Sequence, residues 1–363
     1  MQLQNRPAIL VLGILCVCGY LLGAADAHAQ LPRTVHFARP IMGTWGTVSI
    51  VTADSNAVAE AADAAWAAIE ATDRRFSNWK PDSELSRTNR ALDAGPVDLS
   101  TQAAELVATA LRIHAESNGS FDPTVEPLVR LWGFLGGTPR VPKSAAIEAT
   151  RTRIGADRLH LEATTLHTDR DGVRIDLGGI AKGHAVDRAV AALRAHGIDD
   201  ALVDVSGNMI GLGSPAGRDH WTVGVRDPDT EDQWFATLAL ADDAIATSGN
   251  YEQFVDVNGQ RYGHVLDPRT GWPVDDLVSV TVVAPTAVEA DAWATALLVL
   301  GCEDARHLLA DRPDLAGVLV QSAEDGTHQV WVESSLRDRF GSVTAIRSRF
   351  PVTWFGPGHD ETR

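Results

Sequence analysis

The sequence predicts an α+β fold in which mixed and antiparallel sheets pack against helices. Segments with helical and with strand periodicity follow the order helix, helix, hairpin, helix, strands, which is not the regular repeat of a doubly wound sheet. The 363 residues are 45% hydrophobic and 22% charged, which allows one large core or two modest ones and excludes a disordered or fibrous protein. We expect one domain at 30–350 and a loose tail at 351–363.

Helices are expected where apolar residues recur at helical spacing. Residues 56–76 have this pattern, and residues 100–117 have it between a capping Ser100 and Gly119. Residues 158–177 alternate around Asp171-Gly172 and predict a hairpin. Further helices are predicted at 181–197 and 289–301, and further strands at 201–213, 220–228, 235–249, 278–285, 315–320 and 328–333.

The first 29 residues have the pattern of a secretory signal peptide. Arg6 precedes a long apolar run, and Ala-His-Ala at 27–29 predicts cleavage after Ala29, which would make the mature protein periplasmic. An uncleaved anchor of about 18 residues is the alternative, short for a membrane span, and would hold the protein at the inner membrane. Lipid attachment at Cys16 or Cys18 is disfavoured by the large residues before them.

Cysteine content and charge argue against a disulfide-stabilised protein and against a nucleic-acid-binding protein. Cleavage would leave Cys302 as the single cysteine, so the mature chain would have no internal disulfide. The net charge of -17 lies wholly outside the signal segment, which carries one Arg and one Asp. A nucleic-acid-binding protein needs clustered Lys and Arg, so we expect no nucleic-acid partner.

The segment DLGGIAKG, residues 176–183, has two glycines between a predicted strand and a predicted helix. Glycines at such a turn allow close approach of a ligand, and free N–H groups at a helix start favour an anion such as phosphate. The spacing matches neither the Rossmann nor the P-loop motif. A purely structural turn with a solvated Lys182 is the alternative.

Two further segments carry polar groups suited to phosphate chemistry. Asp291 and Thr295 are four residues apart on a predicted helix, so both oxygens could reach a magnesium ion, although an isolated pair of this kind is commonly structural. His264 precedes the rigid turn Asp-Pro-Arg-Thr-Gly and could act as a general base. A hydrogen-bonded structural histidine is the alternative.

Seven segments in order resemble the motifs of the ApbE family of FAD:protein FMN transferases. They are MGT (42–44), FSNWKPDSELSRTN (76–89), GSFDPTVEPLVRLWGF (119–134), DLGGIAKGHAVD (176–187), IATSGNYEQF (245–254), HVLDPRTGWPV (264–274) and VTVVAPTAVEADAWATAL (280–297). They span nearly the whole mature chain, so the resemblance implies an ApbE-like version of the α+β fold.

The resemblance also implies roles for individual residues. The FAD site would be lined by Met42, Trp79, Ser120, Phe121, Asp122, Gly178, Lys182 and His184. Mg²⁺ would be held by Asp291, Thr295 and the main-chain oxygen of Ala181, while His264 would be the base, with Asp267 shaping its loop at the FAD site. The family usually has tyrosine at Trp79 and His184, and Gly-Gly-Asp at 206–208, whose role stays open.

The implied reaction is magnesium-assisted transfer of FMN from FAD to a threonine hydroxyl, with release of AMP. Family targets carry a Ser/Thr-Gly-Ala-Thr-like run in membrane-bound or extracytoplasmic electron-transfer proteins, and this chain has no such run, so the acceptor is expected to be another protein. FAD hydrolysis to FMN and AMP is the enzymatic alternative. An exported flavin-binding protein without turnover is the other, and it would not need His264.

Overall fold

The computed structural model describes residues 31–54, 58–230, 232–257, 259–323, 325, 327–343 and 348–357. The predicted signal segment 1–29 and the tail end 358–363 lie outside the described residues. From Pro32 onward the chain forms one compact unit. Among the described helices, none combines the length and apolar character that a membrane span requires.

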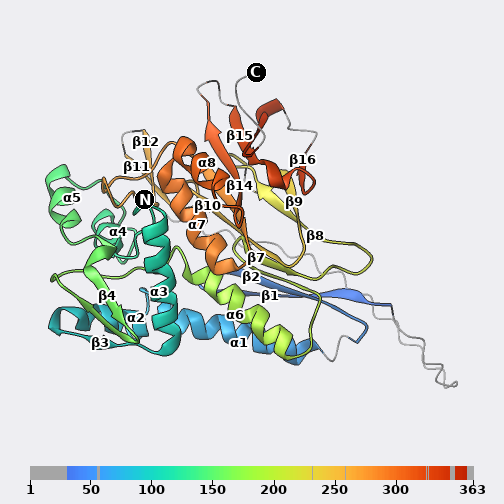
Figure 1. Ribbon diagram of the computed structural model, residues 1–363, viewed down its shortest axis with the longest axis horizontal. Helices are drawn as coiled ribbons and strands as arrows, with labels where there is room; N and C mark the ends of the chain where they lie inside the picture. Colours follow the sequence, from blue (N-terminus) through green and yellow to red (C-terminus); the bar gives the residue numbers. More distant parts are fainter. Residues whose placement is uncertain are drawn as a thin grey trace. The chain divides into compact units, whose positions relative to one another are not determined.

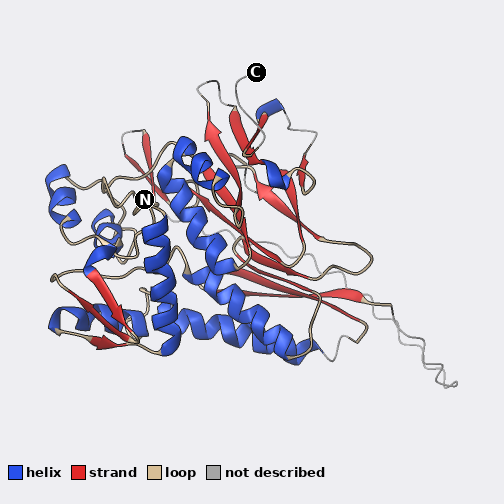
Figure 2. Cartoon of the chain, viewed as in Figure 1, coloured by secondary structure: helices blue, strands red, loops and turns tan. Residues whose placement is uncertain are grey.

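A nine-stranded mixed sheet is the centre of the described part of the chain (Figure 2). Neighbouring strands are antiparallel throughout, except for a parallel pair at one edge, β15 with β17. In sheet order the strands are β1 (Arg33–Ile41), β2 (Thr44–Thr52), β6 (Ala201–Val205), β7 (Asn208–Leu212), β10 (Asp243–Gly249), β13 (Ser279–Ala284), β14 (Ala316–Ser322), β15 (His328–Glu333) and β17 (Val352–Phe355). The predicted α+β class with mixed and antiparallel sheets is confirmed.

Helices pack against one face of this sheet and a smaller sheet packs against the other. Alternate residues of β10 show the division, because Ala244 and Ala246 belong to the core under the helices and Ile245 belongs to the core on the opposite face. Long helices of the first core lie along the sheet in Figure 1. The helices are α1 (Val58–Phe76), α2 (Glu84–Ala91), α3 (Thr101–Glu116), α4 (Glu126–Trp132), α5 (Ser144–Arg151), α6 (Ala181–Ala195), α7 (Ala287–Leu300) and α8 (Cys302–Ala310).

Three small sheets complete the described fold. The sheet on the far face is β16 (Phe340–Ser342), β9 (Trp234–Leu240) and β8 (Trp221–Arg226). The others are β3 (Val97–Asp98), β5 (Thr165–Thr168) and β4 (Leu159–Glu162), and the hairpin β11 (Phe254–Val257) with β12 (Gln260–Gly263). Short 3-10 helices cover Leu92–Ala94, Ala156–Arg158 and Ser334–Leu336.

The predicted hairpin at 158–177 is displaced in the structure. Its two strands are β4 and β5, so the chain turns after Glu162, where Ala163 has a φ of 54°, and not at Asp171-Gly172. The following segment forms no strand, because the side chain of Asn89 replaces a ladder partner. Its Oδ1 accepts from the N–H of Ile175 at 2.7 Å, and its Nδ2 donates to the carbonyl of Ile175 at 2.8 Å.

The tail beyond residue 350 is also not loose throughout. Val352–Phe355 forms β17, which pairs in parallel with β15. Phe355 is buried in the core beneath the helices. The prediction of a loose tail is therefore wrong for these four positions, because an apolar Phe side chain and a run of ladder hydrogen bonds fix them to the sheet edge.

Candidate functional site

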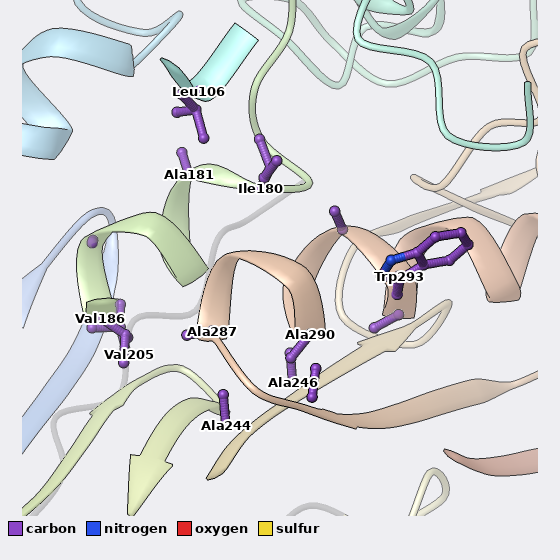
Figure 3. Close-up of a cluster of buried hydrophobic side chains, with 14 of the residues drawn as sticks. Leu106, Ile180, Ala181, Val186, Val205, Ala244, Ala246, Ala287, Ala290 and Trp293 are labelled. Carbon is purple, nitrogen blue, oxygen red and sulfur yellow. The ribbon is translucent and has the colours of Figure 1, made fainter. Parts of the chain in front are cut away.

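Helices α6 and α7 meet at their first turns, and each supplies a carboxylate to the other. Asp291 of α7 accepts a hydrogen bond at 2.9 Å from the N–H of Gly183 in the first turn of α6. In return, Asp187 of α6 accepts from the N–H groups of Ala287 and Val288, both at 2.9 Å. Carboxylates satisfy open N–H groups at helix starts, so the two helices fix one another. Figure 3 shows Ala290 of this α7 segment over β10.

Gly183 permits the close approach of the two helices. A Cβ atom at this position would lie 2.1 Å from the carbonyl oxygen of Ala287 and 2.8 Å from Cβ of Asp291. Neither atom belongs to a flexible side-chain end, so any larger residue would force the helices apart. The glycine therefore sets the position of the Asp291 carboxylate.

Gly183→Ala should lower the free energy of unfolding by about 2 kcal/mol, because overpacking outweighs the roughly 1 kcal/mol helix-propensity gain of Ala over Gly. Urea denaturation followed by circular dichroism measures this change. Ala191→Ser on the exposed side of α6 is the control, with an expected change below about 0.5 kcal/mol. A Gly183→Ala protein as stable as the parent would show that the helices are free to separate.

The carboxylate of Asp291 is buried beside one cation. Its Oδ1 lies 3.9 Å from Nζ of Lys182. Burial raises the pKa of Asp291, while Lys182 and the neighbouring main-chain N–H groups oppose that shift. One turn along α7, the hydroxyl of Thr295 lies 3.2 Å from Oγ of Ser248 and 3.3 Å from the carbonyl oxygen of Asp291. The contact between the two residues of the predicted pair therefore involves the main chain of Asp291, one helical turn before Thr295, and not its carboxylate.

The glycine turn brings the loop after α3 close to Thr295. A Cβ on Gly179 would lie 3.2 Å from Oγ1 of Thr295 and 3.3 Å from the ring of Phe121, so the turn passes between them. Beside Phe121, the Oγ of Ser120 is buried and has no hydrogen-bond partner in the described part of the chain. This orphaned hydroxyl is suited to a polar ligand atom.

Asp122 holds this loop in place from within the protein. Its Oδ1 accepts from the N–H of Thr124 at 2.7 Å and from the hydroxyl of Thr124 at 2.6 Å. Its Oδ2 accepts from the N–H of Ala156 at 3.3 Å. Both carboxylate oxygens are therefore occupied by the protein, and Asp122 acts on the candidate site by shaping the loop.

His264 lies where the hairpin β11–β12 ends, half-buried. Its N–H and its Nδ1 both lie within hydrogen-bond distance of the carbonyl oxygen of Gln253, at 3.0 and 3.2 Å. Burial lowers the pKa of His264 to about 4, the contact with Gln253 opposes the shift, and the charge of Lys182 adds to it. The imidazole is therefore neutral at pH 7, as a general base requires.

The positive charge of Lys182 acts both on the imidazole of His264 and on the carboxylate of Asp291. It also acts on Glu252, which lies in a motif segment but was given no role from the sequence. Partial removal from water raises the pKa of Glu252, Lys182 and Arg226 oppose this shift, and Asp291 adds to it. Glu252 is thus an acidic group near the site that sequence reasoning missed, and it also missed the carboxylate of Asp187 and the hydroxyl of Ser248. The available signal for Asp187 was its position four residues after Gly183, on one helix face.

The expectation of free N–H groups at the start of α6 is not met. Ala181, Gly183 and His184 already donate their main-chain N–H groups to protein oxygens. Gly178 donates its N–H to Oδ1 of Asp176 at 2.6 Å. The carboxylate of Asp291 and the carbonyl groups of the preceding turn accept from these N–H groups. Attraction of an anion to this helix start therefore depends on the side chain of Lys182.

Two clefts hold Trp79 and Met42. Trp79 is 67% exposed and lines a cleft of about 620 Å³. Met42 has a φ of 51° in the turn between β1 and β2 and lines a second cleft of about 460 Å³ with Trp45 and Asp73. A salt bridge of 2.5 Å from Lys80 to Asp73 joins the loop of Trp79 to this second cleft. The two expected flavin contacts therefore line separate clefts, and the linings of these clefts do not include Asp291, Thr295 or His264.

His184 and Asp267 both have protein partners. His184 contacts the ring of Phe76 edge-on with a centroid distance of 5.6 Å. Burial lowers its pKa to about 4, with Arg188 and Arg75 adding to the shift. The two carboxylate oxygens of Asp267 accept from the Arg269 side chain at 2.9 and 3.1 Å, so Asp267 stabilises the turn after His264.

The donor set at Asp291 fits magnesium chemically. Among the described residues, no group of three or more His, Cys, Asp or Glu could hold a metal ion. The expected set needs no such group, because it consists of one carboxylate, one hydroxyl and one carbonyl. Mg²⁺ prefers such hard oxygens and commonly takes few protein ligands, with waters and substrate phosphates as the others.

Residues 42–319 match the ApbE family model. The FAD:protein FMN transferase of Klebsiella pneumoniae (strain 342) is 36% identical over 305 residues, which cover 82% of this chain and 86% of the relative. The FAD:protein FMN transferase of Escherichia coli (strain K12) is 34% identical over 304 residues, with the same two coverages.

Solved structures agree with this match. Flavin transferase ApbE from Vibrio cholerae has a TM-score of 0.76 at 31% identity, covering 85% of this chain and 99% of that chain. The apo form of Pseudomonas stutzeri flavinyl transferase ApbE has a TM-score of 0.73 at 30% identity, covering 90% and 98%. The resemblance inferred from the seven motifs is confirmed: the chain belongs to the ApbE family.

Proposed function

We propose that this chain is an FAD:protein FMN transferase that uses Mg²⁺ and modifies a threonine hydroxyl of an acceptor protein. Membership of the family and the names of its relatives support the transfer of FMN from FAD to a protein. The observation that carries the finer proposal is the buried carboxylate of Asp291, which lies 3.9 Å from Nζ of Lys182 and one helical turn before Thr295. The charge of the same lysine acts on the neutral His264.

In this proposal each group has a separate task. Asp291, Thr295 and the main-chain oxygen of Ala181 would hold Mg²⁺, which would neutralise pyrophosphate charge when bound. Lys182 attracts the same anionic group and replaces the charge that free helix N–H groups do not supply. The buried hydroxyl of Ser120, which has no hydrogen-bond partner among the described residues, would donate to the flavin nucleotide.

His264 accepts the proton of the acceptor threonine. The threonine oxygen forms a bond to the FMN phosphorus, the bond from that phosphorus to the AMP oxygen breaks, and AMP leaves with the electron pair. A hydroxyl is a weak nucleophile, so proton removal by a positioned neutral imidazole contributes about 10²- to 10⁴-fold to the rate. The Gln253 carbonyl beside Nδ1 leaves Nε2 of His264 to take this proton.

Incubation with FAD, Mg²⁺ and a peptide containing Ser-Gly-Ala-Thr tests the function. Mass spectrometry should show an increase matching FMN on the peptide threonine, with an equal amount of AMP released. Free FMN with AMP and no adduct would instead make the protein an FAD hydrolase. If neither an adduct nor free FMN with AMP were formed, the protein would be a flavin-binding protein without turnover. We also propose that the protein is exported, so that its acceptors are extracytoplasmic.

A further inference from the structure

Lys182 lies among several titratable groups of the candidate site. Its Nζ atom is 3.9 Å from Oδ1 of Asp291, and its charge also acts on Glu252 and on the imidazole of His264. The side chain of Lys182 is 32% exposed, whereas that of Asp291 is 5% exposed. A solvent-accessible ammonium group therefore already pairs with the buried carboxylate to which the proposed function assigns Mg²⁺.

Main-chain N–H groups hold the Asp291 carboxylate in addition to this ammonium group. Its Oδ2 accepts from the N–H of Gly183 at 2.9 Å, and the main-chain N–H of Lys182 adds a further hydrogen bond. Both donors belong to the first turn of α6, so they move only with the helix. The ammonium group of Lys182 is carried on a flexible four-carbon stem, so it can leave the carboxylate while both helices stay in place.

The positive charge of Lys182 opposes the binding of a metal ion at Asp291. Asp291 is the single carboxylate of the expected donor set, in which Thr295 and Ala181 contribute uncharged oxygens. The charge of Lys182 cancels the charge of this carboxylate, so the pair offers a divalent cation little net attraction. Burial of Asp291 also reduces the screening of the repulsion between the lysine and the metal. We therefore expect the protein alone to bind the metal weakly.

A dinucleotide with an anionic pyrophosphate offers Lys182 a second partner. Lysine binds phosphate as a flexible point charge, and Lys182 follows the glycine turn at 178–179 in the first turn of α6. When its ammonium group pairs with phosphate oxygens, the charge of Asp291 becomes available to a divalent cation. Phosphate oxygens then supply further ligands of the kind that Mg²⁺ prefers.

Glu252 gives Lys182 a second acidic neighbour within the protein. Partial removal from water raises the pKa of Glu252, and the charge of Lys182 opposes that shift. The lysine therefore remains near a negative charge after it separates from Asp291. This neighbour lowers the electrostatic cost of the separation, because the ammonium group is not left without a counter-charge.

We propose that Lys182 makes the binding of Mg²⁺ depend on bound FAD. Its ammonium group competes with the metal for Asp291 in the free protein and pairs with the pyrophosphate in the FAD complex. The inference rests on the proposed function, in particular on its metal assignment, and it adds the order in which substrate and metal bind. Because coupling between two binding events is reciprocal, Mg²⁺ raises the affinity for FAD by the same factor.

The variant Lys182→Met tests the proposal, because it removes the charge and keeps an unbranched side chain. The probe is Mn²⁺, which binds the same kinds of oxygen ligand as Mg²⁺, and free Mn²⁺ is measured by electron paramagnetic resonance. Titrations are made without FAD and with saturating FAD, in the absence of acceptor, and chromatography confirms that FAD stays intact. Lys143→Met is the matched control, with the same change in charge at an exposed residue beside the start of α5. Asp291→Asn identifies the Mn²⁺ bound at the candidate site.

Without FAD, Lys182→Met should bind Mn²⁺ about tenfold more tightly than the parent, and with FAD its Mn²⁺ affinity should lie within about twofold of the parent value. FAD should therefore raise the Mn²⁺ affinity about tenfold less in this variant, and Lys143→Met should match the parent. An unchanged or lower Mn²⁺ affinity of Lys182→Met without FAD would overturn the proposal. An equal rise with and without FAD would overturn it too, since the lysine would then stay at the carboxylate in the FAD complex.

The same titrations separate this proposal from the proposed function. If Asp291→Asn abolishes Mn²⁺ binding but Lys182→Met lacks the expected effect, only the role of Lys182 is wrong. If Asp291→Asn binds Mn²⁺ as the parent does, the metal assignment is wrong and this proposal is wrong with it. The expected coupling without FMN transfer to an acceptor peptide would count against the transferase function alone.

Discussion

Asp291→Asn should lower the rate of FMN transfer by about 10³-fold or more and remove its dependence on Mg²⁺. A bound metal supplies several kcal/mol of charge stabilisation, and each 1.36 kcal/mol is about tenfold in rate. The amide oxygen of Asn can still accept from Gly183, which now donates to Asp291 at 2.9 Å. Stability should therefore change by no more than about 1 kcal/mol. AMP release over a range of Mg²⁺ concentrations measures the effect.

Asp187→Asn is the matched control for this variant. Asp187 lies in the same pair of helices, and burial raises its pKa to about 6. Its two carboxylate oxygens accept from the N–H groups of Ala287 and Val288 at the start of α7, and it forms no hydrogen bond with Thr295 in the described part of the chain. We expect this variant to lose stability and to keep its Mg²⁺ dependence. If Asp291→Asn transferred FMN at the parent rate and with the same Mg²⁺ requirement, the metal assignment would be refuted.

The fold class was predictable because local patterns and tertiary packing agree over most of the chain. Ser100 caps α3 as its sequence suggests, accepting from the N–H of Ala103 at 3.3 Å. The displaced hairpin shows the limit. Asn89 lies 86 residues from Ile175 in sequence, and its amide satisfies the backbone there, so local alternation at 171–177 predicted a strand that long-range hydrogen bonds replaced.

The sequence suggested which residues could form the site, but it did not predict how the structure connects them. Asp291 and Thr295 do share a helix face, which follows from helical spacing. The exchange of carboxylate hydrogen bonds between α6 and α7 depends on how closely the two helices approach at Gly183. The sequence pattern within either helix does not predict that distance.

His264→Gln should retain FAD binding and lower FMN transfer by about 10²- to 10⁴-fold. Glutamine fills most of the space of the imidazole but accepts no proton near neutral pH. Calorimetric titration with FAD and mass spectrometry of the acceptor peptide separate the two effects. Unaltered transfer by the variant would remove the base assignment, and a parallel loss of FAD affinity would make His264 a binding residue.

The pH profile of the parent gives an independent check on the same residue. A base with its pKa lowered to about 4 is neutral at every pH above about 5, so kcat/KM should be flat from pH 8 to pH 5. A histidine with an ordinary pKa near 6.5 would instead lose about tenfold between pH 7.5 and pH 5.5. The sign follows from burial, which disfavours the charged imidazolium and keeps the proton acceptor available in mild acid. A fall that begins near pH 6.5 and disappears in His264→Gln would keep the base and contradict its burial in the working enzyme.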